Sequence, residues 1–250
     1  PADRAAVAAI RAELDRGDVL ERAGQARAAH DLAATAVAAA ERTAHAPTQA
    51  RALFLLAQTA DAIGDGRAAE AALERALDAA ARSADPPLLA DAWVRMFGVL
   101  GAVQDRFADA ARIYRVAQLS VIAAGDPPAL RLRLLRDLGS MQLEQGELEA
   151  ARATFRDLLT REEARPTTRK DELATALNNL GAVEVELGDF EAARRDLARA
   201  VELIEADLGP AHPSLSFPLV NLGLVLQDQG RFLESIPYLE RAHAIERAAL

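Results

Sequence analysis

The stretch from Leu180 to Val201, LGAVEVELGDFEAARRDLARAV, decides the fold. It contains two amphipathic runs at helical spacing, and Gly188 lies between them, where a glycine marks a turn. Gly181 lies seven residues earlier, inside the first run, where glycine costs about 1 kcal/mol against alanine. A glycine kept there lets a neighbouring helix approach closely. The stretch therefore predicts two closely packed helices joined by a tight turn.

Both glycines recur along the chain. Of the 14 glycines, ten fall into two columns that repeat every 40 to 42 residues. The helix column holds Gly17, Gly98, Gly139, Gly181 and Gly223, with Ala57 in its gap, and the turn column holds Gly24, Gly64, Gly146, Gly188 and Gly230, with Asp105 in its gap. Large residues of the second helices, such as Phe155 and Leu197, alternate with small ones at helical spacing. We therefore predict a repeated antiparallel helix hairpin.

Prolines mark the start of the later repeats, because a proline is tolerated in the first turn of a helix. These prolines are Pro47, Pro86, Pro127, Pro166 and Pro213. The predicted units span residues 3–43, 47–84, 86–124, 127–163, 166–208 and 213–250, with no linker between them. We expect one all-α domain over residues 1–250. Pro218 should delay the first helix of the last unit to about Ser216, or kink it.

Composition and charge narrow the functional classes. Hydrophobic residues make up 51% of the chain and aromatic residues only 4%, as expected for closely packed helices. A net charge of −9 argues against binding to duplex nucleic acid. No apolar stretch approaches the roughly 20 residues of a membrane span. The absence of cysteine excludes disulfides and fits a cytoplasmic location. Because the chain begins with Pro1 rather than Met, we expect a fragment of a longer protein.

The quoted stretch resembles a tetratricopeptide repeat in its Leu-Gly pair, its Gly-Asp-aromatic turn and its second-helix Ala, Leu and Ala. Residues 208–245, LGPAHPSLSFPLVNLGLVLQDQGRFLESIPYLERAHAI, resemble the kinesin-light-chain type through GPAHP, NLG and Pro237. Residues 67–80 and 90–117 are similar to repeat arrays attached to bacterial, notably myxobacterial, serine/threonine kinases. The resemblance implies an α-solenoid of about six repeats in a right-handed superhelix. It also implies a concave groove, lined by the first helices, that binds a peptide or a partner helix.

Some positions depart from the family pattern. Arg16 replaces the large apolar residue that precedes the helix-column position in the other units. Gln142 and Glu184 occupy a column that the family usually fills with an apolar or aromatic residue. We expect the packing to deviate at these two residues.

Residues with catalytic or metal-binding potential form no recognisable constellation. The four histidines, His30, His45, His212 and His243, lack ligand-like spacing, and His212 is expected in a loop or as a helix cap. The sequence GDGRAA at Gly64 mimics a phosphate loop, but no strand precedes it. We therefore predict no enzyme activity, no metal and no cofactor.

All three asparagines of the chain, Asn178, Asn179 and Asn221, lie on predicted first helices. Asn179 and Asn221 hold the same place, two residues before the helix-column glycine. An amide group offers two donors and an acceptor, which suits recognition of a peptide main chain. We therefore predict that the three line the peptide groove. The alternative is that the amides bond between adjacent repeats and fix the superhelical pitch.

Other predicted groove residues divide its surface into apolar and positive parts. Phe54 and Met96 make the earlier part apolar, whereas Arg95, Arg133 and Arg136 place positive charge at its middle. Such a groove favours a segment with an apolar anchor beside acidic groups. The alternative is that helix packing absorbs the apolar residues and that Asp137 neutralises an arginine.

The favoured function is a protein–protein interaction scaffold in a bacterial signalling protein. One alternative is the substrate-recruiting arm of a serine/threonine kinase whose catalytic domain lies elsewhere in a longer chain. Another is a self-assembly module. The chain stops where a further GPxHP unit would open, so the last repeat is expected to lack a cap. Part of its apolar stripe, at Leu226, Ile236 or Ile245, should then be uncovered and support self-association.

Overall fold

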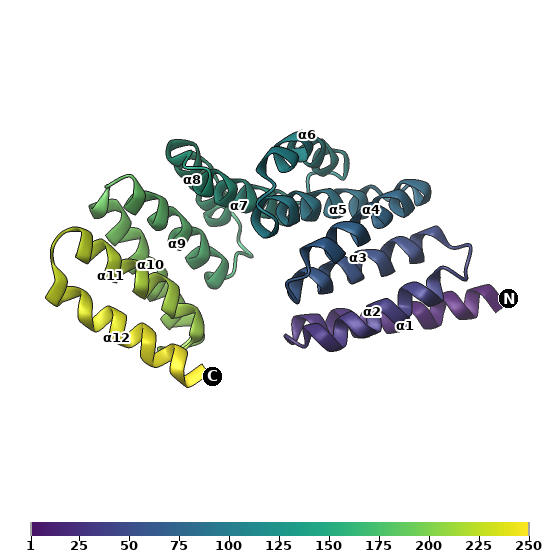
Figure 1. Cartoon of the computed structure of the whole chain (residues 1–250), viewed down its shortest axis with the longest axis horizontal. Helices are drawn as coiled ribbons and strands as arrows, with labels where there is room; N and C mark the ends of the chain where they lie inside the picture. Colours follow the sequence, from purple (N-terminus) through teal and green to yellow (C-terminus); the bar gives the residue numbers. More distant parts are fainter. Residues whose placement is uncertain (1, 250) are drawn as a thin grey trace. The chain divides into compact units, whose positions relative to one another are not determined.

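The chain folds into consecutive helix hairpins (Figure 1). The computed structural model describes residues 2–249. Within that range the chain forms twelve α-helices and no strand, which confirms the all-α prediction. None of the described helices combines the length and the apolar character needed to cross a bilayer.

The helices follow one another in pairs, and their bounds lie close to the units expected from the glycine and proline spacing. The pairs are α1 (Ala2–Arg22) and α2 (Ala26–Ala40), α3 (Ala46–Ala62) and α4 (Gly66–Ser83), α5 (Pro86–Gly98) and α6 (Phe107–Ala123), α7 (Pro128–Glu144) and α8 (Leu148–Glu163), α9 (Lys170–Glu186) and α10 (Phe190–Leu208), and α11 (Ser216–Asp228) and α12 (Phe232–Ala249). A π-helical segment, Val99–Val103, extends α5, and a 3-10 turn, Pro213–Leu215, precedes α11.

The turn inside each hairpin requires a left-handed backbone. Gly188 has φ of 75°, and the other four glycines of the turn column have φ near this value. Asp105, which fills the gap in that column, also adopts a positive φ, of 52°. Asparagine and aspartate are among the few non-glycine residues that tolerate this region. The predicted turn column is therefore confirmed at all six positions.

The helix-column glycines lie where two helices touch. A Cβ added to Gly181 would lie 2.6 Å from Leu197 Cγ on α10, and one added to Gly139 would lie 2.7 Å from the Phe155 ring on α8. Both distances are too short for real carbon contacts, so a larger residue would separate the helices. Gly98 differs, because its close neighbour is the carboxylate of Asp137 on α7, at 2.8 Å.

Helix starts follow the expected chemistry. Asp189 accepts a bond from the Ala192 amide and caps α10, and His212 Nδ1 accepts from the Ser214 amide at 3.3 Å, which confirms its capping role. Pro218 lies in the first turn of α11, and that helix begins at Ser216, which confirms the expected delay.

The described chain divides into two compact units, and the boundary between Asp137 and Leu138 lies within α7. We call them the N-terminal unit and the C-terminal unit. The first has Leu55, Leu73 and Phe97 fully buried, whereas the second has Phe155 and Leu197. The organisation as one domain and the handedness of the array stay predictions.

The expected exposure of the last repeat is correct in part. Ile236 is exposed, but Leu226 and Ile245 are buried, so the expectation for these two residues is wrong. Ile245 packs with Leu215 and Leu219 in the interior of the C-terminal unit. The apolar surface of α12 is instead formed by Phe232, Leu233 and Ile236, of which Leu233 is 83% exposed.

Candidate ligand-binding grooves

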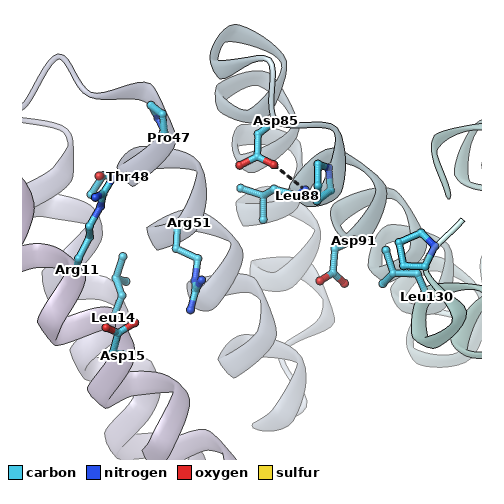
Figure 2. A pocket seen from close by; sticks show the side chains of 12 residues that line it. Arg11, Leu14, Asp15, Pro47, Thr48, Arg51, Asp85, Leu88, Asp91 and Leu130 are labelled. Carbon is cyan, nitrogen blue, oxygen red and sulfur yellow. Dashed lines mark hydrogen bonds between the residues drawn. The ribbon is translucent and has the colours of Figure 1, made fainter. Parts of the chain in front are cut away.

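The N-terminal unit contains a groove lined by its first helices. One hollow of about 590 Å³ is bounded by α1, α3, α5 and the start of α7 (Figure 2). A second hollow of about 370 Å³ adjoins it and shares three of its residues. The shared residues are Arg51, Leu88 and Asp91. We call the two hollows together the N-terminal groove.

Ion pairs join successive first helices of the N-terminal unit. Arg51 of α3 pairs with Asp18 of α1, and Arg95 of α5 donates to Asp61 of α3 at 2.8 Å. The Arg95 guanidinium also lies 5.9 Å from the centre of the Phe54 ring. Only 9% of Arg95 is exposed, and burial lowers its pKa. This placement favours a role for Arg95 in the packing between repeats, and its contact with a ligand stays a prediction.

Phe54 and Met96, the two predicted apolar contacts, are buried. Phe54 lines the second hollow, and its ring also contacts the Arg95 guanidinium. This placement favours the alternative that helix packing absorbs both side chains. Their contact with a ligand stays a prediction.

The predicted positive centre of the groove is largely neutralised. Arg133 Nε lies 3.8 Å from a carboxylate oxygen of Asp137, one turn further along α7. Burial raises the pKa of Asp137, and the charges of Arg133, Arg136 and Arg95 oppose that rise. Arg133 thus lies near a half-buried carboxylate, which agrees with the alternative that Asp137 neutralises an arginine.

The C-terminal unit has a smaller pocket of about 330 Å³ between α9 and α11. Asn178 and Asn179 line it together with Asp171, Thr175 and Phe217. Phe217 is 69% exposed, so an aromatic face stands beside the two amides. We call this site the C-terminal pocket.

The asparagines do not play one role. Asn221 Nδ2 donates to Asn178 Oδ1 at 3.0 Å and joins α11 to α9, which is the expected alternative of a bond between repeats. The side-chain amide of Asn179 forms no hydrogen bond with another described residue, and Asn179 lines the C-terminal pocket. Its contact with a peptide stays a prediction.

This difference predicts opposite effects of two equivalent substitutions. Asn179→Ala should raise the free energy of unfolding by about 0.6 kcal/mol, because alanine is the better helix former. Asn221→Ala gains the same propensity but loses a hydrogen bond worth about 1 kcal/mol, so it should be neutral or slightly destabilising. Urea unfolding of the two variants measures the difference. Equal stabilisation by both would contradict a structural role for the Asn178–Asn221 bond.

Sequence analysis missed several lining residues, although a signal for them exists. The position six residues before the helix column holds Arg11, Arg51, Arg133, Thr175 and Phe217 in five of the six units. Four of these five line the N-terminal groove or the C-terminal pocket, and Arg133 is the exception. Six residues are about 1.7 helical turns, so these residues lie about 120° around the helix from the glycine. Among the described residues, no group of three or more His, Asp or Glu side chains is arranged to hold a metal.

Comparison with known families and structures agrees with this architecture. Residues 172–248 and residues 50–82 match family models of the tetratricopeptide repeat. Comparison with the curated proteins gives no match. The chain therefore carries tetratricopeptide repeats in these two segments, and its fold is an all-α repeat solenoid.

Three solved structures illustrate the likeness. BtubC (BKLC) from P. vanneervenii is 22% identical, with a TM-score of 0.68, over 100% of this chain and 92% of that one. NprR in complex with its cognate peptide NprX is 11% identical, with a TM-score of 0.69, over 93% of this chain and 66% of that one. A Rap protein complexed with Competence and Sporulation Factor is 15% identical, with a TM-score of 0.68, over 94% of this chain and 72% of that one. At these identities the likeness shows the fold alone.

Proposed function

We propose that this chain is a non-catalytic protein-interaction scaffold that binds an extended peptide or a partner helix along its first helices. The observation that carries the proposal is the N-terminal groove, which four successive first helices line. Leu88 and Leu130 offer apolar surface there, and Arg11 and Asp91 offer charged groups without an ion pair among the described residues. Solenoid grooves of this kind suit extended ligands. The structures of NprR and Rap were each solved with a bound partner of their own.

The scaffold would belong to a bacterial signalling protein of the cytoplasm, with repeats of the kinesin-light-chain type. Within that assignment, the chain could recruit substrates for a serine/threonine kinase domain of the same longer protein. Support for it comes from the similarity of residues 67–80 and 90–117 to kinase-attached arrays.

Self-assembly is the second candidate function. The exposed side chains of Phe232, Leu233 and Ile236 form an apolar stripe on α12, which favours association with another apolar surface. Light scattering over a range of protein concentrations tests this candidate. A particle mass that does not change with concentration would oppose it.

The peptide-binding proposal is tested with two neighbouring leucines of α5. Leu88 lines the N-terminal groove and Leu89 does not, and both are half-buried. Peptides selected from a random displayed library on the parent chain should bind Leu88→Ala about fivefold more weakly, because part of an apolar contact is lost. Leu89→Ala should keep the parental affinity, as measured by fluorescence anisotropy. Failure to select any binding peptide, or equal affinity for both variants, would contradict the proposal.

A further inference from the structure

Three arginines line the N-terminal groove, and only one of them, Arg51, pairs with a carboxylate, that of Asp18. Two further ion pairs, Arg95 with Asp61 and Arg133 with Asp137, lie outside its lining. Arg22 donates its Nε to the Asp18 carbonyl oxygen at 3.1 Å. Arg11 is exposed on α1, and its guanidinium forms no hydrogen bond or ion pair with another described residue. Arg11 and Arg22 are therefore the lining guanidinium groups without a carboxylate partner among the described residues.

The carboxylates that line the groove outnumber its guanidinium groups. Asp85 is used as the cap of α5, where its Oδ1 accepts from the Leu88 amide at 3.0 Å (Figure 2). The side chain of Asp91, one helical turn beyond Leu88, forms no hydrogen bond or ion pair with another described residue. In all, five carboxylates and three guanidinium groups line the two hollows. The groove thus has a negative excess, as does the whole chain, with its net charge of −9.

Asp91 holds the central place among these acids. It is half-buried and lines both hollows, and it lies on α5, across the hollow from Arg51 of α3 (Figure 2). Burial is the largest influence on its pKa and raises it, although the charges of Arg133, Arg95 and Arg51 act against that rise. A carboxylate that has lost water without gaining a partner is stabilised by a cation that reaches it.

The walls near Asp91 suit the stem of a long basic side chain. Leu14, Leu88 and Leu130 give the hollow apolar surface, and Pro47, Pro87 and Pro127 border it. Arginine and lysine pack their methylene groups on such surfaces while the charged end reaches a polar partner. A short acidic side chain has no comparable stem and would meet the Asp91 charge.

We propose that the N-terminal groove recognises a peptide through a basic side chain, arginine or lysine, whose charged end pairs with Asp91. This inference rests on the proposed peptide-binding function and specifies its ligand. It reverses the acidic preference expected from the sequence, because none of the three arginines behind that expectation lines the N-terminal groove. Asp91 acts as the specificity-determining residue, and the leucines supply the apolar contacts.

The test uses a displayed library of random dodecapeptides as the probe and the full chain as the bait. Three baits are compared, namely the parent, Asp91→Asn and Asp31→Asn. Asp31 is an exposed acid of α2 that does not line the groove, so its variant controls for the change in net charge. The parent and Asp31→Asn should enrich peptides with arginine or lysine at one fixed position, and Asp91→Asn should lose that enrichment.

The most enriched peptide is then synthesised with its basic residue intact and with the neutral isostere citrulline or norleucine in its place. The parent should bind the basic form about tenfold more tightly, as expected for a charge-assisted hydrogen bond at a partly exposed site. Asp91→Asn should reduce this preference to twofold or less, and added salt should weaken it in the parent.

The outcomes separate this inference from the function on which it rests. Enriched peptides that carry acidic or uncharged residues, yet bind Leu88→Ala more weakly than the parent, would overturn the basic anchor and leave the groove as a peptide site. An undiminished basic preference in Asp91→Asn would overturn it as well. If no enriched peptide binds Leu88→Ala more weakly than the parent, both proposals would be overturned.

Discussion

Gly181→Val is expected to lower the free energy of unfolding of the C-terminal unit by about 3 kcal/mol, the largest loss among the changes considered. The new Cβ would lie 2.6 Å from Leu197 Cγ and 2.8 Å from its Cδ2. Leu197 is fully buried beside Leu222 and Val225, so its side chain cannot move away. The gain in helix propensity over glycine, about 0.4 kcal/mol, is too small to offset the separation of α9 from α10.

Urea unfolding followed by far-ultraviolet circular dichroism measures this loss. Ala153→Val is the matched control, because Ala153 is an exposed residue of α8 and the same substitution there costs only propensity, roughly 0.6 kcal/mol. Gly181→Ala should fall between the two variants. A Gly181→Val variant as stable as Ala153→Val would show that the close approach of α9 and α10 is not required.

The glycine columns explain how far the fold could be predicted. A glycine inside a strong helix has few purposes other than close approach, so its 41-residue recurrence identified the hairpin contact from residue type alone. The identity of the neighbour was not contained in that pattern. Gly181 meets Leu197 of its own hairpin, whereas Gly98 meets Asp137 of the following first helix. The helix-column glycines indicate where another side chain approaches the helix closely. Which side chain this is depends on how the neighbouring helices are placed along and around their axes.

The candidate site was harder to predict for the same reason. The sequence placed Asn179 and Asn221 in one column, yet Asn221 bonds to Asn178. Neighbouring residues point about 100° apart on a helix, so a modest rotation of α9 against α11 selects one amide over the other. In the N-terminal unit, the ion pairs Arg51–Asp18 and Arg95–Asp61 depend in the same way on how successive first helices are rotated against each other. Their effect on the groove's charge therefore became visible only in three dimensions.

Glu184→Leu is expected to stabilise the C-terminal unit by about 2 kcal/mol at pH 8. Glu184 is 1% exposed on α9, and only one of its carboxylate oxygens has a partner among the described residues, Arg156 Nη2 at 3.3 Å. Burial, followed by the charge of Asp196, raises the pKa of Glu184 to about 6. The equivalent residue of the last repeat is the buried Leu226, so a leucine fits this column. Arg156 is 53% exposed and can return to water when its partner is removed.

The pH dependence identifies the cause of this gain. The folded pKa of about 6 exceeds the ordinary value of 4.5, so the native state binds more protons than the unfolded state between these values. The parent should therefore lose about 2 kcal/mol of stability as the pH rises from about 4.5 past 6, and the loss should level off above that range. In Glu184→Leu that loss should be absent, so the advantage of the variant should nearly vanish at pH 4.5 and be complete at pH 8.

Urea unfolding of the parent, Glu184→Leu and Glu186→Leu at pH 4.5, 6 and 8 tests both the sign and the cause. Glu186 is an exposed glutamate two residues further along α9, so its replacement controls for the loss of one carboxylate without relief of burial. An equal gain at every pH would attribute the stabilisation to added apolar contact rather than to the buried charge. A loss of stability in Glu184→Leu at pH 8 would mean that the Arg156 bond outweighs the cost of burying Glu184, and that this junction between α8 and α9 depends on its ion pair.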